Sequence, residues 1–276
     1  MQLLLILFAA GALAAPPRME PVEDYHRMVG IPLAERIKQQ ELAMDFDGAR
    51  IVGGSPIGAG VHQFVVGLLT NFVNAASVCT ATMLSNTRTL TAAHCSGSGA
   101  RSYTLVFGST YLFSGGVRVA STEFISHPLY GTFNYDIAII RHSWVAYTNL
   151  IQPITLPTGF ADYAHQWAMA VGYGQTNTNV AIPSTQTQHQ IWLWVMSNDE
   201  CRQFAGSFLI PAMICTSGAG GVGVCNGDSG GPLFIVSGNT RIQIGVTSFR
   251  GTTCEAGQPS GYIRVTYFQN WIRQNL

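Results

Sequence analysis

The sequence predicts an all-β domain, built as a barrel or a sandwich. Thirty glycines, together with many Ser, Thr and Asn residues, favour short strands and tight turns over long helices. After residue 51, short apolar and β-branched runs alternate with turn residues, which is the pattern of such a domain. The expected strands are QFVVGLLT (63–70), YTLVFGS (103–109), DIAIIR (136–141), QIWLWVM (190–196), PLFIVS (232–237) and RIQIGVTSF (241–249).

Helices are expected at only two places, residues 31–48 and the tail 267–276, where apolar residues recur at helical spacing. Hydrophobic residues make up 47% of the 276 residues and charged residues 10%, so the chain can bury a large core. The formal net charge is zero, and no basic surface for nucleic acid is expected.

The first 15 residues, MQLLLILFAAGALAA, have an apolar core that ends in small residues. This pattern predicts a secretory signal peptide over residues 1–15. A membrane anchor is the alternative, but the apolar run is shorter than the roughly 20 residues that a spanning helix needs. No other segment of the sequence has the length to span a bilayer, so an exported product without a membrane anchor is expected.

Six cysteines follow this leader, and an even number in an exported chain favours three disulfides. Buried free thiols are the alternative, and the residues alone leave the pairing open. No CxxC pair occurs, so we expect no zinc site and no other metal. The cysteines are Cys79, Cys95, Cys201, Cys215, Cys225 and Cys254.

Residues 16–50 differ in composition from everything that follows. They hold seven acidic and five basic residues and no cysteine. The next residues, IVGGSP, begin the β-rich part of the chain, so the sequence divides into 1–15, 16–50 and a domain over 51–276.

A serine with nucleophilic potential lies in GDSGGP (227–232). The glycines around Ser229 permit a tight turn that exposes its hydroxyl and leaves backbone N–H groups free for an oxyanion. A base is available at His94 in TAAHC, and a carboxylate at Asp136 begins the strand DIAII. Each residue alone has a structural explanation, as a turn serine, a core histidine or a strand cap. Together they favour nucleophilic catalysis.

TAAHC, DIAII and GDSGGP, in the order His, Asp, Ser, resemble the chymotrypsin family of serine proteases, and other folds carry this triad in other orders. The resemblance spans about residues 51–276 and implies two six-stranded antiparallel β-barrels with a C-terminal helix. It implies Ser229 as nucleophile, His94 as general base and Asp136 as the group that fixes the imidazole tautomer. The N–H groups of Gly227 and Ser229 would form the oxyanion hole, and Ser248 would support the aspartate.

The resemblance also implies how the cysteines pair. Cys79 would bond Cys95 beside His94, and Cys225 would bond Cys254 between the nucleophile turn and a wall of the specificity pocket. Cys201 would then bond Cys215.

The same resemblance makes residues 16–50 an activation propeptide. Cleavage in ARIVGG, between Arg50 and Ile51, would free an α-amino group, and Asp228 would be its partner. A trypsin-like protease is therefore the expected activator. With no cysteine, the propeptide has no disulfide tether to the domain.

The specificity pocket is expected to carry no charge at its base. Trypsin-like members have Asp at the position of Gly223, and Ser260 on the far wall is also neutral. The resemblance therefore implies cleavage after large apolar or aromatic residues.

Two positions depart from the family pattern. Phe249 replaces the usual tryptophan of the pocket wall, and Arg250 replaces the usual glycine at its entrance. Arg250 has three possible roles: pointing to solvent, obstructing the pocket mouth, or attracting an acidic group of the substrate.

Lys38 is the only lysine of the chain, so arginines carry the positive side-chain charge of residues 51–276 at alkaline pH. Arginine stays protonated at pH values where lysine loses its proton. The absence of lysine from residues 51–276 and the sequence YHRMVGIPLAERIK (25–38) resemble midgut chymotrypsins of moth and butterfly larvae, although chance can also explain the absence of lysine. We expect a digestive monomer in the gut lumen that needs no cofactor, takes protein and peptide substrates and is open to protein inhibitors. The alternatives are a protease-fold binding protein closed by Arg250 and a limited-proteolysis regulator.

Overall fold

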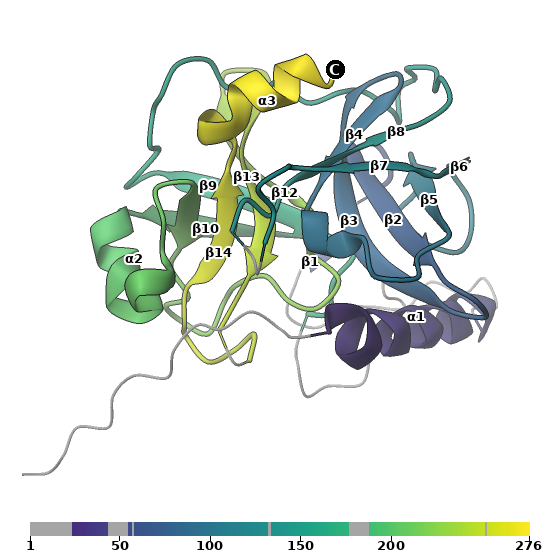
Figure 1. Ribbon diagram of the computed structural model, residues 1–276, viewed down its shortest axis with the longest axis horizontal. Coiled ribbons are helices and arrows are strands. Elements are labelled where there is room, and N and C mark those ends of the chain that lie inside the picture. Colours follow the sequence, from purple (N-terminus) through teal and green to yellow (C-terminus); the bar gives the residue numbers. More distant parts are fainter. Residues whose placement is uncertain (1–23, 44–54, 57, 132–133, 177–187, 252) are drawn as a thin grey trace, which may run out of the picture.

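The computed structural model describes residues 24–43, 55–56, 58–131, 134–176, 188–251 and 253–276. Two curled antiparallel sheets stand side by side in Figure 1, the first drawn in blue and teal and the second in green and yellow. In this view the short C-terminal helix α3 (Gln269–Gln274) lies above the sheets, and the longer helix α1 (Ile31–Ala43) lies below them. The two sheets confirm the predicted all-β class.

The first sheet comprises seven strands in the order β6-β5-β2-β3-β4-β8-β7, all paired antiparallel. β6 and β7 follow one another in the chain with only Thr122 between them, and they pair at opposite ends of the order. The sheet therefore curls round as a half-barrel. Its strands are β2 (Val65–Asn71), β3 (Ala76–Ser85), β4 (Arg88–Thr91), β5 (Ser102–Phe107), β6 (Val117–Ser121), β7 (Glu123–Ser126) and β8 (Ala138–Arg141).

The second sheet closes on itself. Its order is β1-β10-β11-β14-β13-β12-β9, and the additional pairing of β10 with β9 joins six strands into a barrel. The two-residue strand β1 pairs with β10 outside this ring. The strands are β1 (Ser55–Pro56), β9 (Trp167–Gly172), β10 (His189–Met196), β11 (Met213–Thr216), β12 (Pro232–Ser237), β13 (Thr240–Phe249) and β14 (Ser260–Arg264).

Strand β2 is buried on both faces, which explains why its sequence is a continuous apolar run. Val66 and Leu68 belong to one buried cluster with Met83. Val65 and Leu69, which alternate with them, belong to a second buried cluster that includes Phe234 of β12 and residues of the lower helix. A strand buried on both faces has a continuous apolar run. The second cluster joins the two sheets, and it explains why they pack as one body.

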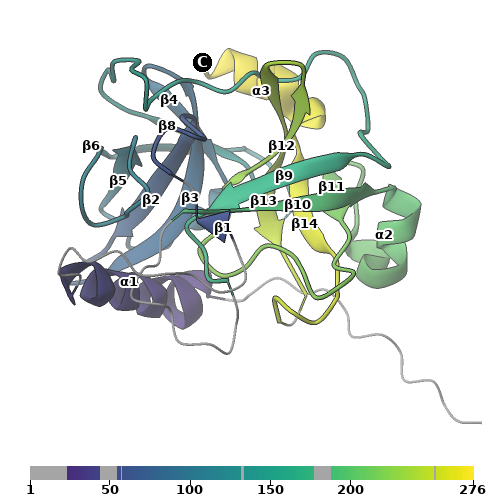
Figure 2. The same cartoon turned by 180° about the vertical axis from the view of Figure 1, so that it is seen from behind.

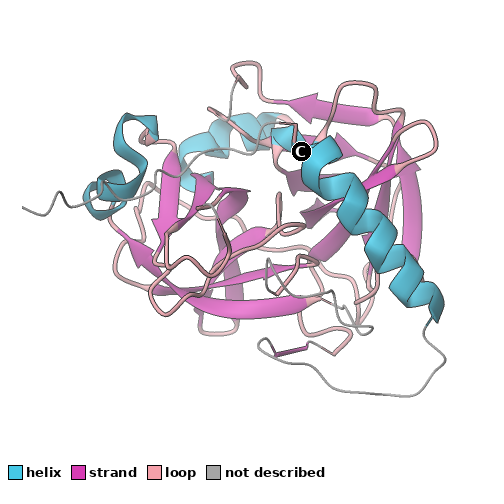
Figure 3. Cartoon of the chain, turned by 90° about the horizontal axis from the view of Figure 1, so that it is seen from below, coloured by secondary structure: helices cyan, strands magenta, loops and turns pink. Residues whose placement is uncertain are grey.

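Helices form at the two expected places. The lower helix, α1 (Ile31–Ala43), follows a turn of π-helix, η1 (His26–Gly30), and residues 44–48 of the expected helix lie outside the described residues. Figures 2 and 3 show from two further sides that α1 crosses the lower face of the molecule. The tail forms a turn of 3-10 helix, η4 (Val265–Phe268), and then α3 (Gln269–Gln274). None of the described helices has the length and apolar character to span a bilayer.

The expectation of helix at these two places alone was wrong, because α2 (Asn198–Ala205) forms between β10 and β11. Its start carries a capping box: Ser197 Oγ accepts from Glu200 N, and Glu200 Oε2 accepts from Ser197 N. Ser-x-x-Glu is a sequence signal for a helix start. It was present in SNDE (197–200), but the helix is too short for apolar periodicity to reveal it.

Replacing Ser197 by Ala should lower the free energy of unfolding by about 1 kcal/mol, because the N–H of Glu200 loses its acceptor. Denaturant unfolding of the purified chain measures this difference. Ser197→Thr is the matched control and should retain most of the stability, since its hydroxyl caps the same N–H. Equal losses in both variants would show that the cap does not stabilise the helix.

Candidate active site

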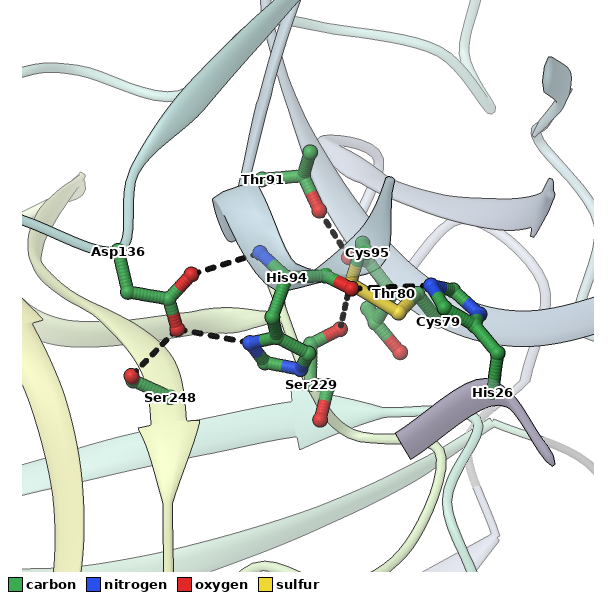
Figure 4. A network of polar contacts seen from close by, with 9 residues as sticks. All are labelled: His26, Cys79, Thr80, Thr91, His94, Cys95, Asp136, Ser229 and Ser248. Carbon is green, nitrogen blue, oxygen red and sulfur yellow. Dashed lines mark hydrogen bonds and ion pairs between the residues drawn. A yellow bond between two sulfur atoms is a disulfide. The ribbon is translucent and has the colours of Figure 1, made fainter. Parts of the chain in front are cut away.

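Three elements from both sheets bring His94, Asp136 and Ser229 together. His94 lies in a short 3-10 turn, η2 (Ala93–Cys95), after β4, and Asp136 lies two residues before β8. Ser229 lies in the glycine-rich turn before β12, and Figure 4 shows it beside the His94 ring. His94 and Ser229 also line the same small cavity. The residues that the sequence singled out as catalytic candidates are therefore neighbours.

The Asp136 carboxylate is fully buried and is held by three donors. Oδ1 accepts from the His94 backbone N–H at 2.8 Å, and Oδ2 accepts from His94 Nδ1 at 2.7 Å. Ser248 Oγ in β13 donates to Oδ2 at 2.5 Å. A buried charge requires such partners. Because Nδ1–H donates to Asp136, the neutral ring presents Nε2 as a proton acceptor.

The turn around Ser229 is fixed by β3. Thr80 N donates to Ser229 O at 2.8 Å, and Thr80 Oγ1 donates to Gly227 O at 2.9 Å. Gly227 and Gly230 have φ values of +97° and +81°, a conformation that glycine adopts without the strain imposed by a Cβ. At Gly230 a Cβ would also lie 2.1 Å from Thr91 Oγ1. Sequence reasoning missed Thr80, whose one signal is its place next to Cys79.

All six cysteines form the disulfides that the resemblance implied. Cys79 bonds Cys95 and so links β3 to the turn that carries His94. Cys225 bonds Cys254, and Cys201 bonds Cys215. Ligand atoms of Cys79, His94 and Cys95 lie within 4.8 Å of one another. The two sulfurs are joined to each other, so no thiolate is available there for a metal.

Asp228, next to the nucleophile, is partly buried and lines a cavity of about 310 Å³ together with Gly172, Gly174 and His189 among others. Its carboxylate accepts from Cys225 N and Gly174 N, each at 2.8 Å. Burial raises its pKa to about 6, against the opposing effect of these two hydrogen bonds. Arg50 and Ile51 lie outside the described residues.

The expected pocket base is uncharged. Ser260 is buried, and its Oγ accepts from Val224 N at 3.1 Å. A Cβ on Gly223 would lie 2.7 Å from that hydroxyl, so the two positions face each other across a narrow gap. The buried Phe249 ring contacts Phe208 edge-on, with centroids 5.0 Å apart.

Arg250 is partly buried and lines the same small cavity as His94 and Ser229. It donates to Asn226 Oδ1 at 2.7 Å and to Gly251 O at 2.8 Å. Burial lowers its pKa, and the charge of Glu255 opposes that effect. The cavity that Arg250 shares with His94 and Ser229 has a volume of only about 30 Å³, too little for a large side chain. Of the three roles expected for Arg250, obstruction of the pocket mouth stays a prediction.

The cavity also has a wall that the sequence did not predict. Tyr25, in the segment expected to be removed as a propeptide, lines it together with His94 and Ser229. No sequence pattern connects residue 25 with the site, because the contact arises only from the path of the chain across the lower face.

The other histidines pack against neighbouring groups. His62 contacts Gln190 Oε1, and His142 contacts Thr89 Oγ1. His127 stacks on Tyr135, with centroids 5.3 Å apart.

Two curled antiparallel sheets, with a buried His–Asp pair beside a serine in a glycine turn, define a chymotrypsin-like serine protease. The family model described as Trypsin matches residues 51–272, and the chain belongs to this family. It is a serine endopeptidase, and its substrates are proteins.

Relatives with curated names agree with this assignment. "Collagenase" of Hypoderma lineatum is 35% identical over 234 residues, which cover 82% of this chain and 87% of the relative. "Serine protease 1" of Drosophila melanogaster is 34% identical over 234 residues, 82% of this chain and 85% of the relative. A solved structure of HL collagenase matches with a TM-score of 0.72 and 34% identity, covering 82% of this chain and 98% of that one.

The partly buried Asp228 gives the uncleaved chain a specific pH dependence. Its pKa of about 6 exceeds the ordinary aspartate value of 3.8. A raised carboxyl pKa stabilises the folded state fully below pH 4 and loses that contribution as pH rises through 6. We expect the unfolding free energy of an Arg50→Gln chain, relative to the same chain with Asp228→Asn, to fall by roughly 2 kcal/mol from pH 4 to 7. Urea unfolding at each pH measures the difference, and a constant difference contradicts this account.

Proposed function

We propose that the chain is the secreted zymogen of a digestive endopeptidase that cleaves after large apolar and aromatic residues. Residues 1–15 serve as the signal peptide, 16–50 as the activation propeptide and 51–276 as the mature enzyme. The observation that carries the proposal is the buried Asp136 carboxylate, which holds His94 in one tautomer beside Ser229. The expected activator is a trypsin-like protease that cuts after Arg50.

In the proposed mechanism, Ser229 Oγ attacks the scissile carbonyl carbon while His94 Nε2 takes the hydroxyl proton. Asp136 stabilises the imidazolium through the Nδ1–H hydrogen bond. The backbone N–H groups of Gly227 and Ser229 stabilise the oxyanion. His94 then gives the proton to the leaving amine, and water releases the acyl group by the same steps in reverse.

Activation follows from the electrostatics of Asp228. In the uncleaved chain this carboxyl group is partly buried with two backbone donors, and the loss of solvent raises its pKa to about 6. The α-amino group freed at Ile51 would supply a positive partner within the cavity beside it. Pairing favours the charged carboxylate and would set the adjacent turn, including Gly227 and Ser229.

Three features support the finer parts of the proposal. The neutral residues Gly223 and Ser260 leave no charge to attract Lys or Arg. Residues 51–276 contain nine arginines and no lysine, which suits alkaline gut fluid because arginine keeps its charge there. The propeptide has no cysteine to retain it. We propose a monomer in the gut lumen, open to protein inhibitors.

The experiment that tests this function uses protein cleaved after Arg50, with the Ile51 terminus confirmed by sequencing. A peptide panel varies only the residue before the scissile bond and is assayed near pH 7 and near pH 10, with casein and collagen as protein substrates. We expect cleavage after Phe, Tyr, Leu and Met at both pH values. Cleavage confined to Lys and Arg would overturn the pocket assignment, and loss of activity just above pH 8 would overturn the alkaline role.

A second function is favoured by Arg250, whose side chain is bonded to Asn226 beside the small cavity that contains Ser229. If it stays there after cleavage, the protein acts as a binding protein or a regulator with one target. Phosphonylation of Ser229 without cleavage of any peptide would support this alternative. Arg250→Gly should then restore cleavage after Phe.

Replacing Asp136 by Asn should lower kcat about 10⁴-fold, because the amide cannot accept from both His94 Nδ1 and its other donors, and the imidazole takes the wrong tautomer. Steady-state kinetics on the activated enzyme measure the loss. Ser248→Ala is the matched comparison: it removes one donor to the carboxylate but keeps the His94 contact, so its loss should be much smaller. Equal losses would place the effect in folding rather than in the tautomer.

A further inference from the structure

The N-terminal segment (residues 24–43) begins inside the active site. The Tyr25 side chain is 8% exposed, and its ring meets the His94 ring edge-on with centroids 5.1 Å apart. Its hydroxyl donates to Val78 O in β3 at 2.8 Å. An aromatic side chain so placed occupies the space beside the catalytic base.

The Tyr25 hydroxyl also reaches the nucleophile turn. Tyr25 and Ser229 line the same small cavity, and the Ser229 side chain and the Gly227 backbone both act to lower the pKa of the Tyr25 hydroxyl. Burial outweighs them and raises the pKa of Tyr25 above its ordinary value, so the phenol stays neutral. Tyr25 thus fills space beside Ser229 that a substrate carbonyl would need.

His26 anchors the next position. Its Nδ1 lies 2.8 Å from Ser77 Oγ, and its Nε2 lies 3.0 Å from the carbonyl oxygen of His94, as Figure 4 shows for the latter contact. The ring packs edge-on against Phe72, with centroids 5.2 Å apart. Burial lowers the pKa of His26 to about 4, with the charge of His94 acting in the same direction. His26 is therefore neutral at the pH of any serine protease assay.

Helix α1 extends this contact across the lower face. Leu33, Ala34 and Ile37 are at most 3% exposed and join the buried cluster between the two sheets. Near the end of the helix, Glu41 accepts from Leu112 N at 2.7 Å, Phe113 N at 2.9 Å and Ser114 Oγ at 2.9 Å. The segment is thus held at both ends and along its apolar stripe, as a bound peptide helix is.

We propose that this face of the protease domain is a peptide-binding site, and that its ligand is the segment Tyr25–Ala43, which inhibits the enzyme both before cleavage and, as a free peptide, afterwards. The inference rests on the proposed activation after Arg50. It adds a second restraint: cleavage frees the Ile51 amine, but access to Ser229 also requires the peptide to dissociate. Because no disulfide retains the peptide, dilution removes it, and the enzyme stays inhibited where it is stored concentrated.

The test uses the full chain, cleaved after Arg50 and separated from its propeptide, together with a synthetic peptide of residues 24–43. The substrate is a small chromogenic peptide ester. We expect competitive inhibition, seen as a raised apparent KM at constant kcat, and slower phosphonylation of Ser229. No inhibition at millimolar peptide, or inhibition that leaves phosphonylation unchanged, overturns the proposal.

Variant peptides locate the contact. Tyr25→Ala and His26→Ala should each weaken inhibition at least about tenfold, equivalent to roughly 1.4 kcal/mol. Gln39→Ala is the matched control, because Gln39 is exposed and its hydrogen bond is to Glu35 within the helix. The control should inhibit like the native peptide. If Tyr25→Ala and His26→Ala inhibit as well as the control, the peptide does not bind as the structure indicates.

A second measurement does not depend on the isolated peptide folding as a helix. The full chain is cleaved and assayed without separation at a series of dilutions. Specific activity should rise on dilution, and in a Tyr25→Ala chain it should be high at every concentration. Concentration-independent activity in the native chain overturns the proposal.

Failure of the proposed function is distinguishable from failure of this inference. If the cleaved enzyme hydrolyses no substrate, the proposed activity fails, but fluorescence anisotropy of the labelled peptide still reports binding. Binding that needs Tyr25 and protects Ser229 from phosphonylation then supports the inference alone, and absence of binding overturns it.

Discussion

The structure depends first on one buried charge. Asp136 lies where the two sheets meet, and its carboxylate is satisfied only because His94 arrives from the first sheet and Ser248 from the second. A buried carboxylate without donors would cost several kcal/mol. Correct packing of the sheets and correct orientation of the imidazole are therefore the same condition. Ser229 enters this arrangement through Thr80, which ties the nucleophile turn to β3.

A second carboxylate, the partly buried Asp228, lies in the opposite situation. It has two backbone donors, and its pKa is raised by burial rather than lowered by a positive partner. Tyr25 of the N-terminal segment lines the small cavity beside the same turn. Two independent restraints thus act on Gly227 and Ser229, one electrostatic and one steric, and we propose that cleavage relieves the first and dissociation the second.

Much of the fold follows from local pattern. The six apolar runs form strands because β-branched and aromatic residues alternate with turn residues, and the two periodic segments form helices. The sequence analysis did not predict helix α2, because its eight residues are too few to show apolar periodicity, although its capping box is visible in the sequence. The ring also requires β9 to pair with β12, where Ala170 lies opposite Leu233, and no local pattern encodes a pairing between strands so remote in the chain.

The sequence by itself determined the strands, the glycine turn at Ser229, the neutral residues Gly223 and Ser260, and the presence of His94, Asp136 and six cysteines, because these depend on residue type and local spacing. Only the tertiary structure decided that Thr80 fixes the nucleophile turn, that Arg250 bonds Asn226 beside the small cavity, and that Tyr25 lies against His94. These three are contacts between segments remote in the chain, and they arise from burial of shared apolar surface, which a one-dimensional pattern does not record.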